Sequence, residues 1–259
     1  MNNLIIIEGL PCSGKSTTAE FIAGKLGAKY FDEDCGNHPA DYEYHAFIDN
    51  SALDSFSEND HELIRAVSIR KVDGFIVPLR KFTGDLLEKL LQYKIYDGLP
   101  WETERPVMLD KWHEFVNNAR HGRYVFNCVL LQNPMCETMM RFGFEITESA
   151  RYIGEICNII APLDPFVVYL RCSKIRPLIE KAIPERGNDW LNAVIDYHCK
   201  GGYGKKRGLS GFEGYISALE ERQRREVAIL ESLKLQYLII DDPANDWGKT
   251  YVQLTEALK

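Results

Sequence analysis

Eight residues near the start of the chain, GLPCSGKS at positions 9–16, fit the pattern G-x-x-x-x-G-K-[ST] at every position. The glycines of such a loop adopt torsion angles that other residues resist, and they let backbone N–H groups close on phosphate oxygens. The loop delivers the phosphates to a helix N-terminus, where unpaired N–H groups and the helix dipole favour negative charge. The pattern therefore predicts a phosphate-binding loop (P-loop) between a strand and a helix.

The residues on either side of this loop predict a βαβ unit. Residues 3–8 are a short apolar run, typical of a strand buried on both faces of a parallel sheet. Residues 15–26 carry apolar side chains at helical spacing, and residues 28–31 suit a second strand that runs into three acidic residues, 32–34. A right-handed crossover between the two strands is expected.

Similar patterns along the chain predict one α/β domain over residues 1–259, with a mostly parallel sheet flanked by helices. Further strands are expected at 124–131, 166–170 and 238–240. Further helices are expected at 110–120, 147–161, 173–200, 213–234 and 247–258. The stretch 35–120 is expected to be mostly helical, with one short strand at 74–79 that Pro78 assigns to a sheet edge.

Composition excludes several classes of protein. The formal net charge of -7 gives no general attraction to nucleic acid or anionic membrane. No apolar run approaches the ~20 residues of a membrane-spanning helix. The seven cysteines are scattered without a C-x-x-C pair, which indicates reduced thiols rather than a disulfide framework or a zinc site. A cytoplasmic protein is expected, without a nucleic-acid or membrane partner, and a homodimer is left open.

The loop predicts which residues hold the nucleotide and its metal ion. Lys15 is expected to reach the β- and γ-phosphates, Ser16 to ligate Mg²⁺, and Thr17 to lie near the α-phosphate. ATP is favoured because the chain has no Asn/Thr-Lys-x-Asp guanine motif. The predicted nucleotide-binding residues are Gly9, Pro11, Cys12, Ser13, Gly14, Lys15, Ser16 and Thr17.

The first 35 residues, with strand, Glu-Gly-Leu-Pro-Cys-Ser-Gly-Lys-Ser-Thr, helix and strand, resemble the nucleoside and nucleotide kinases, including thymidylate kinase. The resemblance implies a P-loop NTPase fold with a central parallel sheet of about five strands. It implies Mg-ATP as the phosphoryl donor and an acceptor cleft over the strand ends. It also implies that residues 35–120 cover the acceptor and that residues 173–212 form a basic lid.

In that group an acid after the second strand contacts the acceptor hydroxyl, and a carboxylate there can take its proton. Glu33 and Asp34 are the favoured candidates beside Asp32, and His38 and Asp41 follow in the same loop. The choice among these acids stays open.

The same group carries an acid at the end of the next core strand, and this sequence departs from that pattern. The predicted strand 124–131 carries Asn127 and ends in Gln132-Asn133-Pro134. Either Ser16, phosphates and water hold the magnesium with polar support from Asn127 or Gln132, or Glu33 or Asp34 serves the metal. The departure also leaves open a weak catalyst, or a nucleotide-binding protein that hydrolyses ATP slowly.

Basic side chains of the lid region are expected to stabilise the charge of the transferring phosphoryl group. Arg186 is the favoured one, because a guanidinium matches phosphate geometry better than an ammonium. Residues 201–214 carry six glycines and are expected to form a mobile loop. Helix 213–234 is expected to face solvent, with Arg222 as a weaker candidate for a phosphate contact. The other basic candidates are Arg171, Arg176, Lys181, Lys200, Lys205, Lys206 and Arg207.

The sequence therefore predicts an ATP- and Mg²⁺-dependent phosphotransferase whose partner is a small-molecule phosphoryl acceptor, foremost a nucleoside or nucleotide. Lys15, Glu33 or Asp34, and Arg186 are the expected catalytic residues, and Ser16 the expected metal ligand. Tyr93, Tyr96 and Trp112 lie in the acceptor-covering stretch, where stacked aromatic rings would favour a nucleoside. The alternatives are a kinase of a sugar, an antibiotic or another metabolite, and a nucleotide-binding regulator with slow hydrolysis.

Overall fold

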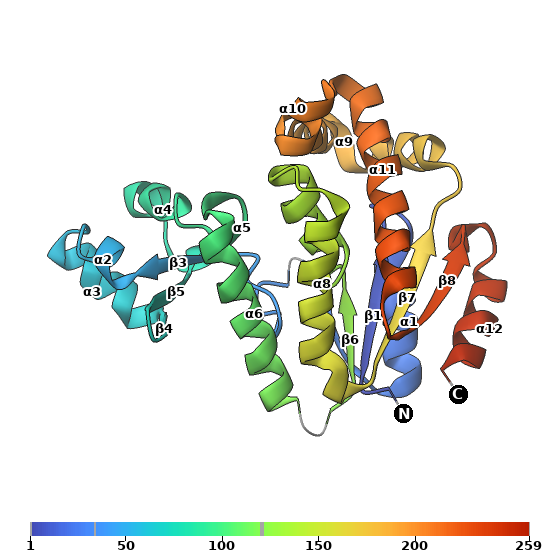
Figure 1. The fold of residues 1–259 in the computed structure, drawn as a ribbon, viewed down its shortest axis with the longest axis horizontal. Helices are drawn as coiled ribbons and strands as arrows, with labels where there is room; N and C mark the ends of the chain where they lie inside the picture. Colours follow the sequence, from blue (N-terminus) through green and yellow to red (C-terminus); the bar gives the residue numbers. More distant parts are fainter. Residues whose placement is uncertain (1, 34, 120–121, 259) are drawn as a thin grey trace. The chain divides into compact units, whose positions relative to one another are not determined.

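The computed structural model describes residues 2–33, 35–119 and 122–258 (Figure 1). The chain forms two compact units, the first of residues 1–33 and 115–259 and the second of residues 34–114. Helix α6, Trp101–Asn118, begins in the second unit and ends in the first. The second unit overlaps the stretch 35–120, which the sequence predicted to be mostly helical.

The first unit is built on a five-stranded parallel sheet in the order β2-β6-β1-β7-β8. Its strands are β1 (Leu4–Gly9), β2 (Lys29–Phe31), β6 (Tyr124–Asn127), β7 (Pro165–Arg171) and β8 (Gln236–Asp241). Its helices are α1 (Lys15–Leu26), α7 (Gln132–Met135), the π-helical η2 (Cys136–Arg141), α8 (Ile146–Ile160), η3 (Ala161–Leu163), α9 (Ile175–Lys200), α10 (Gly202–Arg207), α11 (Gly211–Ser232), η4 (Pro243–Asn245) and α12 (Trp247–Ala257). The predicted α/β fold, with a parallel sheet of five strands flanked by helices, is confirmed.

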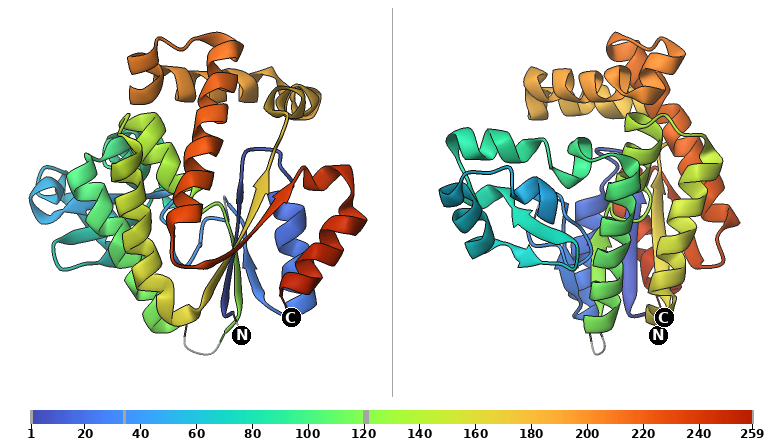
Figure 2. Two further views of the ribbon diagram at one scale, coloured as in Figure 1. Left: turned by 45° about the vertical axis from the view of Figure 1, so that its right-hand side comes forward. Right: turned by 60° about the vertical axis from the view of Figure 1, so that its left-hand side comes forward.

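Helices cover both faces of this sheet (Figures 1 and 2). Alternate residues of β1, such as Ile5 and Ile7, pack with Ile22 of α1 and Leu254 of α12 on one face. Helices α8 and α11 cover the other face, and α9 lies beyond the carboxyl ends of the strands. The carboxyl ends of β2, β6 and β1 are therefore neighbours, and the residues that follow them share one edge of the sheet.

The carboxylate of Glu8 fixes the turn after β6 against the end of β1. Glu8 is fully buried and accepts three backbone N–H bonds, from Leu130 at 2.7 Å, Leu131 at 2.9 Å and Gln132 at 3.0 Å. Burial raises the pKa of Glu8 to about 7, against the opposing effect of these N–H groups. A buried carboxyl is tolerated here because its oxygens are bonded.

Strand β6 is shorter than predicted. It ends at Asn127 rather than at residue 131, because Cys128 takes a left-handed conformation with φ of 68° and turns the chain. Residues 132–141, for which the sequence suggested no helix, form α7 and η2.

The prediction of a mobile loop at 201–214 is wrong, since these residues form α10 and the start of α11. A Cβ at Gly204 would lie 2.4 Å from the carbonyl oxygens of His198 and Cys199. The glycine at this position therefore permits close backbone packing rather than flexibility.

Helix α11 is not the solvent-facing helix that its charges suggested. Arg222 and Glu226 are at most 1% exposed and form an ion pair at 3.1 Å, and Glu226 also accepts from the Tyr169 hydroxyl at 2.6 Å. On the same helix, Glu221 forms ion pairs with Arg224 at 2.6 Å and with Arg225 at 2.8 Å.

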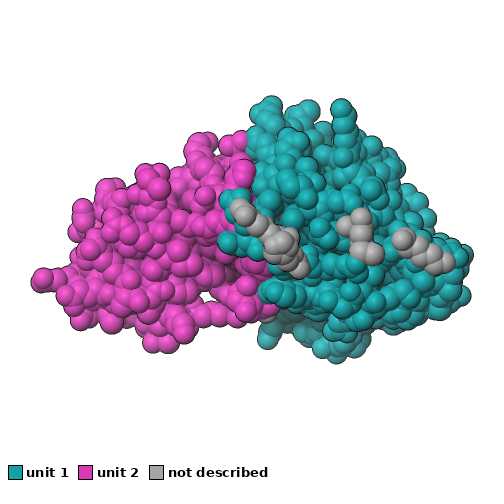
Figure 3. Space-filling view, turned by 90° about the horizontal axis from the view of Figure 1, so that it is seen from below, with its two compact units in different colours: residues 1–33, 115–259 teal, residues 34–114 magenta. Residues whose placement is uncertain are grey.

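The second unit (Figure 3) contains a sheet that the sequence largely missed. Its strands β3 (His45–Asp49), β4 (Ile69–Arg70) and β5 (Gly74–Pro78) pair antiparallel in the order β3-β5-β4, so β5 is central and not an edge strand. Pro78 is tolerated because it is the last residue of β5. The helices of this unit are α2 (Asn50–Leu53), α3 (Glu58–Val67), η1 (Leu79–Lys81), α4 (Gly84–Leu91) and α5 (Ile95–Gly98), with most of α6.

Over the described residues, no helix combines the length and the apolar character needed to cross a membrane.

Substitution Glu8→Gln tests the buried carboxyl. The unfolded chain releases this proton near pH 4.5 and the folded chain near 7, so folding takes up a proton between these values. The stability of the wild-type protein relative to Glu8→Gln is therefore expected to fall as pH rises through this window, by roughly 3 kcal/mol. Urea unfolding of both proteins from about pH 5 to about pH 8 measures this difference. Parallel stability curves would contradict the assignment.

Candidate nucleotide and metal site

The predicted P-loop joins the end of β1 to the first turn of α1. Gly14 caps α1 in the left-handed conformation with φ of 94°, where a side chain is strained. The ring of Trp247 lies over it, and a Cβ at Gly14 would stand 2.5 Å from ring carbon Cη2. Lys15 is buried, and its ammonium donates to the carbonyl oxygens of Gly9 at 3.1 Å and Leu10 at 2.8 Å. The loop thus has a defined conformation, in which the Lys15 side chain folds back and bonds the loop's own carbonyl groups.

A cavity of about 580 Å³ opens in front of this loop. The P-loop, the ends of two neighbouring strands and helix α9 line it together. The predicted site residues in its wall are Pro11, Cys12, Gly14, Lys15, Ser16, Thr17, Glu33, Asn127, Gln132 and Arg186. Gly9 begins the loop at the end of β1, and Asp34 lies outside the described residues.

Ser16, Asp32 and Asn127 form one hydrogen-bonded group. The Asn127 amide Nδ2 donates to Asp32 Oδ1 at 2.6 Å and to Ser16 Oγ at 3.3 Å, and Ser16 Oγ lies 3.4 Å from the same Asp32 oxygen. Carboxylate and hydroxyl oxygens are the donors that Mg²⁺ takes, commonly one or two from the protein with phosphates and water for the rest. No cluster of three or more His, Cys, Asp or Glu that would hold a metal alone occurs in the described part of the chain. The donor set therefore fits an ion that arrives with a nucleotide.

Glu33 is held by different partners. Its two carboxylate oxygens accept from Gln132 Nε2 at 3.0 Å and from the Cys128 thiol at 3.3 Å, both on the turn after β6. Its neighbours in the cavity include Arg186, whose guanidinium stacks on the Trp190 ring at 5.2 Å. An acid and a cation thus line the same cavity as the P-loop lysine.

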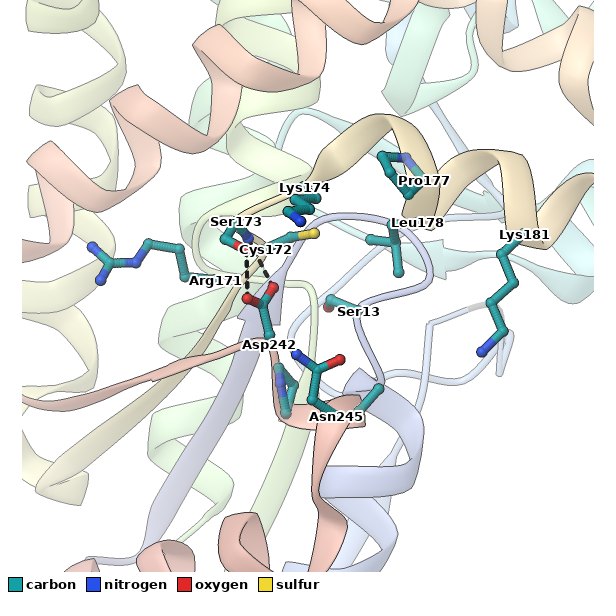
Figure 4. Close-up of a pocket in the computed structure, with 12 residues that line it drawn as sticks. Ser13, Arg171, Cys172, Ser173, Lys174, Pro177, Leu178, Lys181, Asp242 and Asn245 are labelled. Carbon is teal, nitrogen blue, oxygen red and sulfur yellow. Dashed lines mark hydrogen bonds between the residues drawn. The ribbon is translucent and has the colours of Figure 1, made fainter.

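A second cavity, of about 560 Å³, adjoins the other side of the P-loop (Figure 4). Ser13 of the loop, Lys174 and Lys181 of the α9 region, and Asp242 and Asn245 after β8 line it. Asp242 accepts from the backbone N–H of Ser173 at 2.8 Å, which joins the ends of β7 and β8.

The other basic candidates are engaged elsewhere in the first unit. Arg171 forms a two-pronged pair with Asp241, and Arg176 pairs with Glu213 and Glu180. Lys205, Lys206 and Arg207 lie on α10, where Lys206 donates to the Gly143 carbonyl at 2.6 Å, and Lys200 pairs with Asp196. Arg222 is buried against Glu226, which leaves its guanidinium inaccessible to a phosphate.

The candidates of the acceptor-covering stretch lie within the second unit. Burial lowers the pKa of His38 to about 3, so its ring is neutral, and Nδ1 accepts from the Ala40 N–H at 3.2 Å. Asp41 accepts from the Tyr96 hydroxyl at 2.7 Å, and Trp112 is 1% exposed. Tyr93 packs on the apolar core of this unit. These contacts give each of them a structural role there.

Two residues near the phosphate loop had no sequence signal. Trp247, which covers Gly14, follows the loop by more than two hundred positions and carries no motif. Cys128 contacts Glu33 only because the chain turns sharply after β6.

No protein-family model matches the chain, and no curated protein sequence matches it either. Several solved structures match it over nearly its full length. Deoxyadenosine kinase from M. mycoides with bound dCTP has 17% identity and a TM-score of 0.44, covering 98% of this chain and 96% of that one. The YorR protein from Bacillus subtilis, in complex with phosphorylated GDP, has 14% identity and a TM-score of 0.45, covering 98% and 95%. Thymidylate kinase from Candida albicans has 14% identity and a TM-score of 0.40, covering 99% and 89%.

Nucleoside and nucleotide kinases, the group that the first 35 residues resemble, are thus among the structures that this chain matches. At these identities and TM-scores, activity has to be inferred from the chain's own residues.

Substitution Gly14→Ala tests the shape of the loop. The added Cβ meets the Trp247 ring and the residue keeps a positive φ, so we expect a loss of more than about 1 kcal/mol of stability and of nucleotide binding. Gly24→Ala is the matched control, because its Cβ meets nothing within 4 Å on α1, and it should stabilise the protein by up to about 1 kcal/mol. Thermal unfolding and titration with a fluorescent ATP analogue measure both effects. Equal behaviour of the two variants would refute this account of the loop.

Proposed function

We propose that this chain is an ATP- and Mg²⁺-dependent phosphotransferase that acts on a small molecule, foremost a nucleoside or a nucleotide. One observation supports this most directly. The cavity in front of the P-loop is lined by Lys15 and Ser16 on one side and by Glu33 and Arg186 on the others. A lysine, a carboxylate and an arginine around one cavity are the groups that phosphoryl transfer requires.

The chemistry of such a transfer is mostly positioning and charge stabilisation. Lys15 exchanges its two carbonyl partners for phosphate oxygens, and Arg186 neutralises charge on the transferring group. Glu33, oriented by Gln132 and Cys128, accepts a hydrogen bond from the acceptor hydroxyl and takes its proton as the bond forms. Magnesium, when bound with the nucleotide, neutralises charge on the β- and γ-phosphates.

Two side chains favour a nucleobase in the acceptor. The Trp190 ring and the Gln132 carboxamide both line the cavity, and an aromatic face with an amide is suited to stack on a base and bond its edge. The second cavity, beside Ser13 and Asp242, has room for the adenine of ATP on the other side of the loop.

The alternatives each rest on one feature. Two acids and two amides in the cavity wall, Glu33, Glu185, Asn127 and Gln132, would also suit a sugar or an antibiotic rich in hydroxyl and amino groups. Asn127, where the resembled kinases carry an acid, favours a nucleotide-binding regulator with slow hydrolysis.

A screen of ATP consumption over nucleosides, nucleotides, sugars and aminoglycosides tests the proposal. We expect a nucleoside or nucleotide to accelerate ADP formation in the wild-type protein and no acceleration in Lys15→Ala, whose loop has lost its only cation. Stimulation by sugars or antibiotics alone would support the second candidate. Slow ADP formation that no acceptor changes would support the regulator.

Substitution Arg186→Ala tests the lid. We expect kcat to fall by about a hundredfold or more with a smaller change in nucleotide affinity, because the guanidinium acts on charge that develops during transfer. Arg224→Ala is the control, since Arg224 is exposed on α11 and pairs with Glu221. Unchanged kcat in Arg186→Ala would remove Arg186 from the mechanism.

A further inference from the structure

The end of β6 carries an amide beside a carboxylate at the end of β2. Asn127 Nδ2 lies 2.6 Å from Asp32 Oδ1, and these two strands are neighbours in the sheet. Both side chains also reach Ser16, the residue after the P-loop lysine. The three groups therefore form one small polar cluster, and two of its members, Ser16 and Asn127, line the cavity.

We propose that Asp32 supplies the carboxylate directed at the magnesium ion of the bound nucleotide, and that Asn127 holds this carboxylate in place. This inference rests on the proposed use of Mg-ATP and assigns the metal-directed acid to the end of β2 rather than to the end of β6.

The charges of the cluster explain the amide at position 127. An aspartate there would stand within hydrogen-bond distance of Asp32, and two carboxylates so close cannot both ionise readily. An amide donates a hydrogen bond to Asp32 instead and leaves one full negative charge beside the Ser16 hydroxyl. The position therefore accommodates an acid on either strand, but not on both.

The free oxygen of Asn127 points to a ligand. Asn127 is 2% exposed, it lines the cavity, and its Oδ1 has no hydrogen-bond partner among the residues that the structure describes. A buried amide oxygen without a partner costs free energy unless something in the cavity bonds it. A hydrated cation is suited to this place, because Mg²⁺ usually keeps several of its waters.

The neighbouring acid, Glu33, has different hydrogen-bond partners from Asp32. Both oxygens of Glu33 accept hydrogen bonds from the turn after β6, from Gln132 and Cys128, whereas Asp32 shares its contacts with Ser16. The two adjacent acids thus serve two functions, Asp32 toward the metal and Glu33 toward the acceptor.

Manganese binding tests this assignment without catalysis. Electron paramagnetic resonance measures free Mn²⁺ during titration of the full chain saturated with a non-hydrolysable ATP analogue. We expect Asp32→Asn to weaken Mn²⁺ binding by about 10- to 100-fold, the range seen when groups that orient or support a metal site are removed. The double variant Asp32→Asn/Asn127→Asp exchanges acid and amide and is expected to recover most of the lost affinity. Asp32→Ser serves as a second variant if Asp32→Asn folds poorly.

Glu20→Gln is the matched control, because it removes the same charge from the exposed surface of α1. Its Mn²⁺ affinity should equal that of the wild-type protein. Normal nucleotide binding with unchanged Mn²⁺ affinity in Asp32→Asn, or no recovery in a folded double variant, would overturn this inference and leave the proposed function standing. Failure of the wild-type protein to bind the nucleotide would overturn both.

Discussion

The buried carboxylate of Glu8 is the interaction on which the candidate site depends. Glu8 is the last residue of β1 before Gly9, which begins the P-loop, and its three N–H partners, Leu130, Leu131 and Gln132, follow β6. Asn127 and Gln132 stand on either side of that turn. The Glu8 side chain therefore holds the start of the phosphate loop in a fixed position relative to Asn127 and Gln132, and this arrangement is the frame of the site. A carboxyl buried so deeply is stable only with such partners, which makes the frame rigid as well as local.

The strand order turns this frame into a site. Because β6 lies between β1 and β2, the loop after β1, the amide after β6 and the acids after β2 meet at one sheet edge. Parallel sheets bind ligands beyond the carboxyl ends of their strands for this reason. The cations come from other directions, Lys15 from the start of α1 and Arg186 from α9. Opposite charges thus surround the cavity without neutralising one another in a direct ion pair between these side chains.

The sequence predicted those parts of the fold that local patterns determine. The strand, loop and helix of residues 4–26 follow from apolar spacing and the glycine motif, and their bounds agree closely with prediction. The contact between Asp32 and Asn127 joins positions 95 residues apart and depends on strand pairing that no local pattern contains. The glycines near α10 led to the prediction of a mobile loop. Their role in close backbone packing depends on the tertiary structure, which a local sequence pattern does not contain. The charges of α11 indicated a solvent-facing helix, but Arg222 and Glu226 form an ion pair in the interior.

Asn127 has a different meaning in the structure than in the sequence. As an isolated departure from the resembled kinases, it favoured a weak catalyst or a regulator. Beside Asp32, it is one half of a pair in which an acid at one strand end excludes an acid at the next. The charge available to a metal ion at this edge is then the same as with an acid at position 127 and a neutral residue at position 32. Loss of an acid at one strand is therefore no argument against phosphoryl transfer when a neighbouring strand carries it.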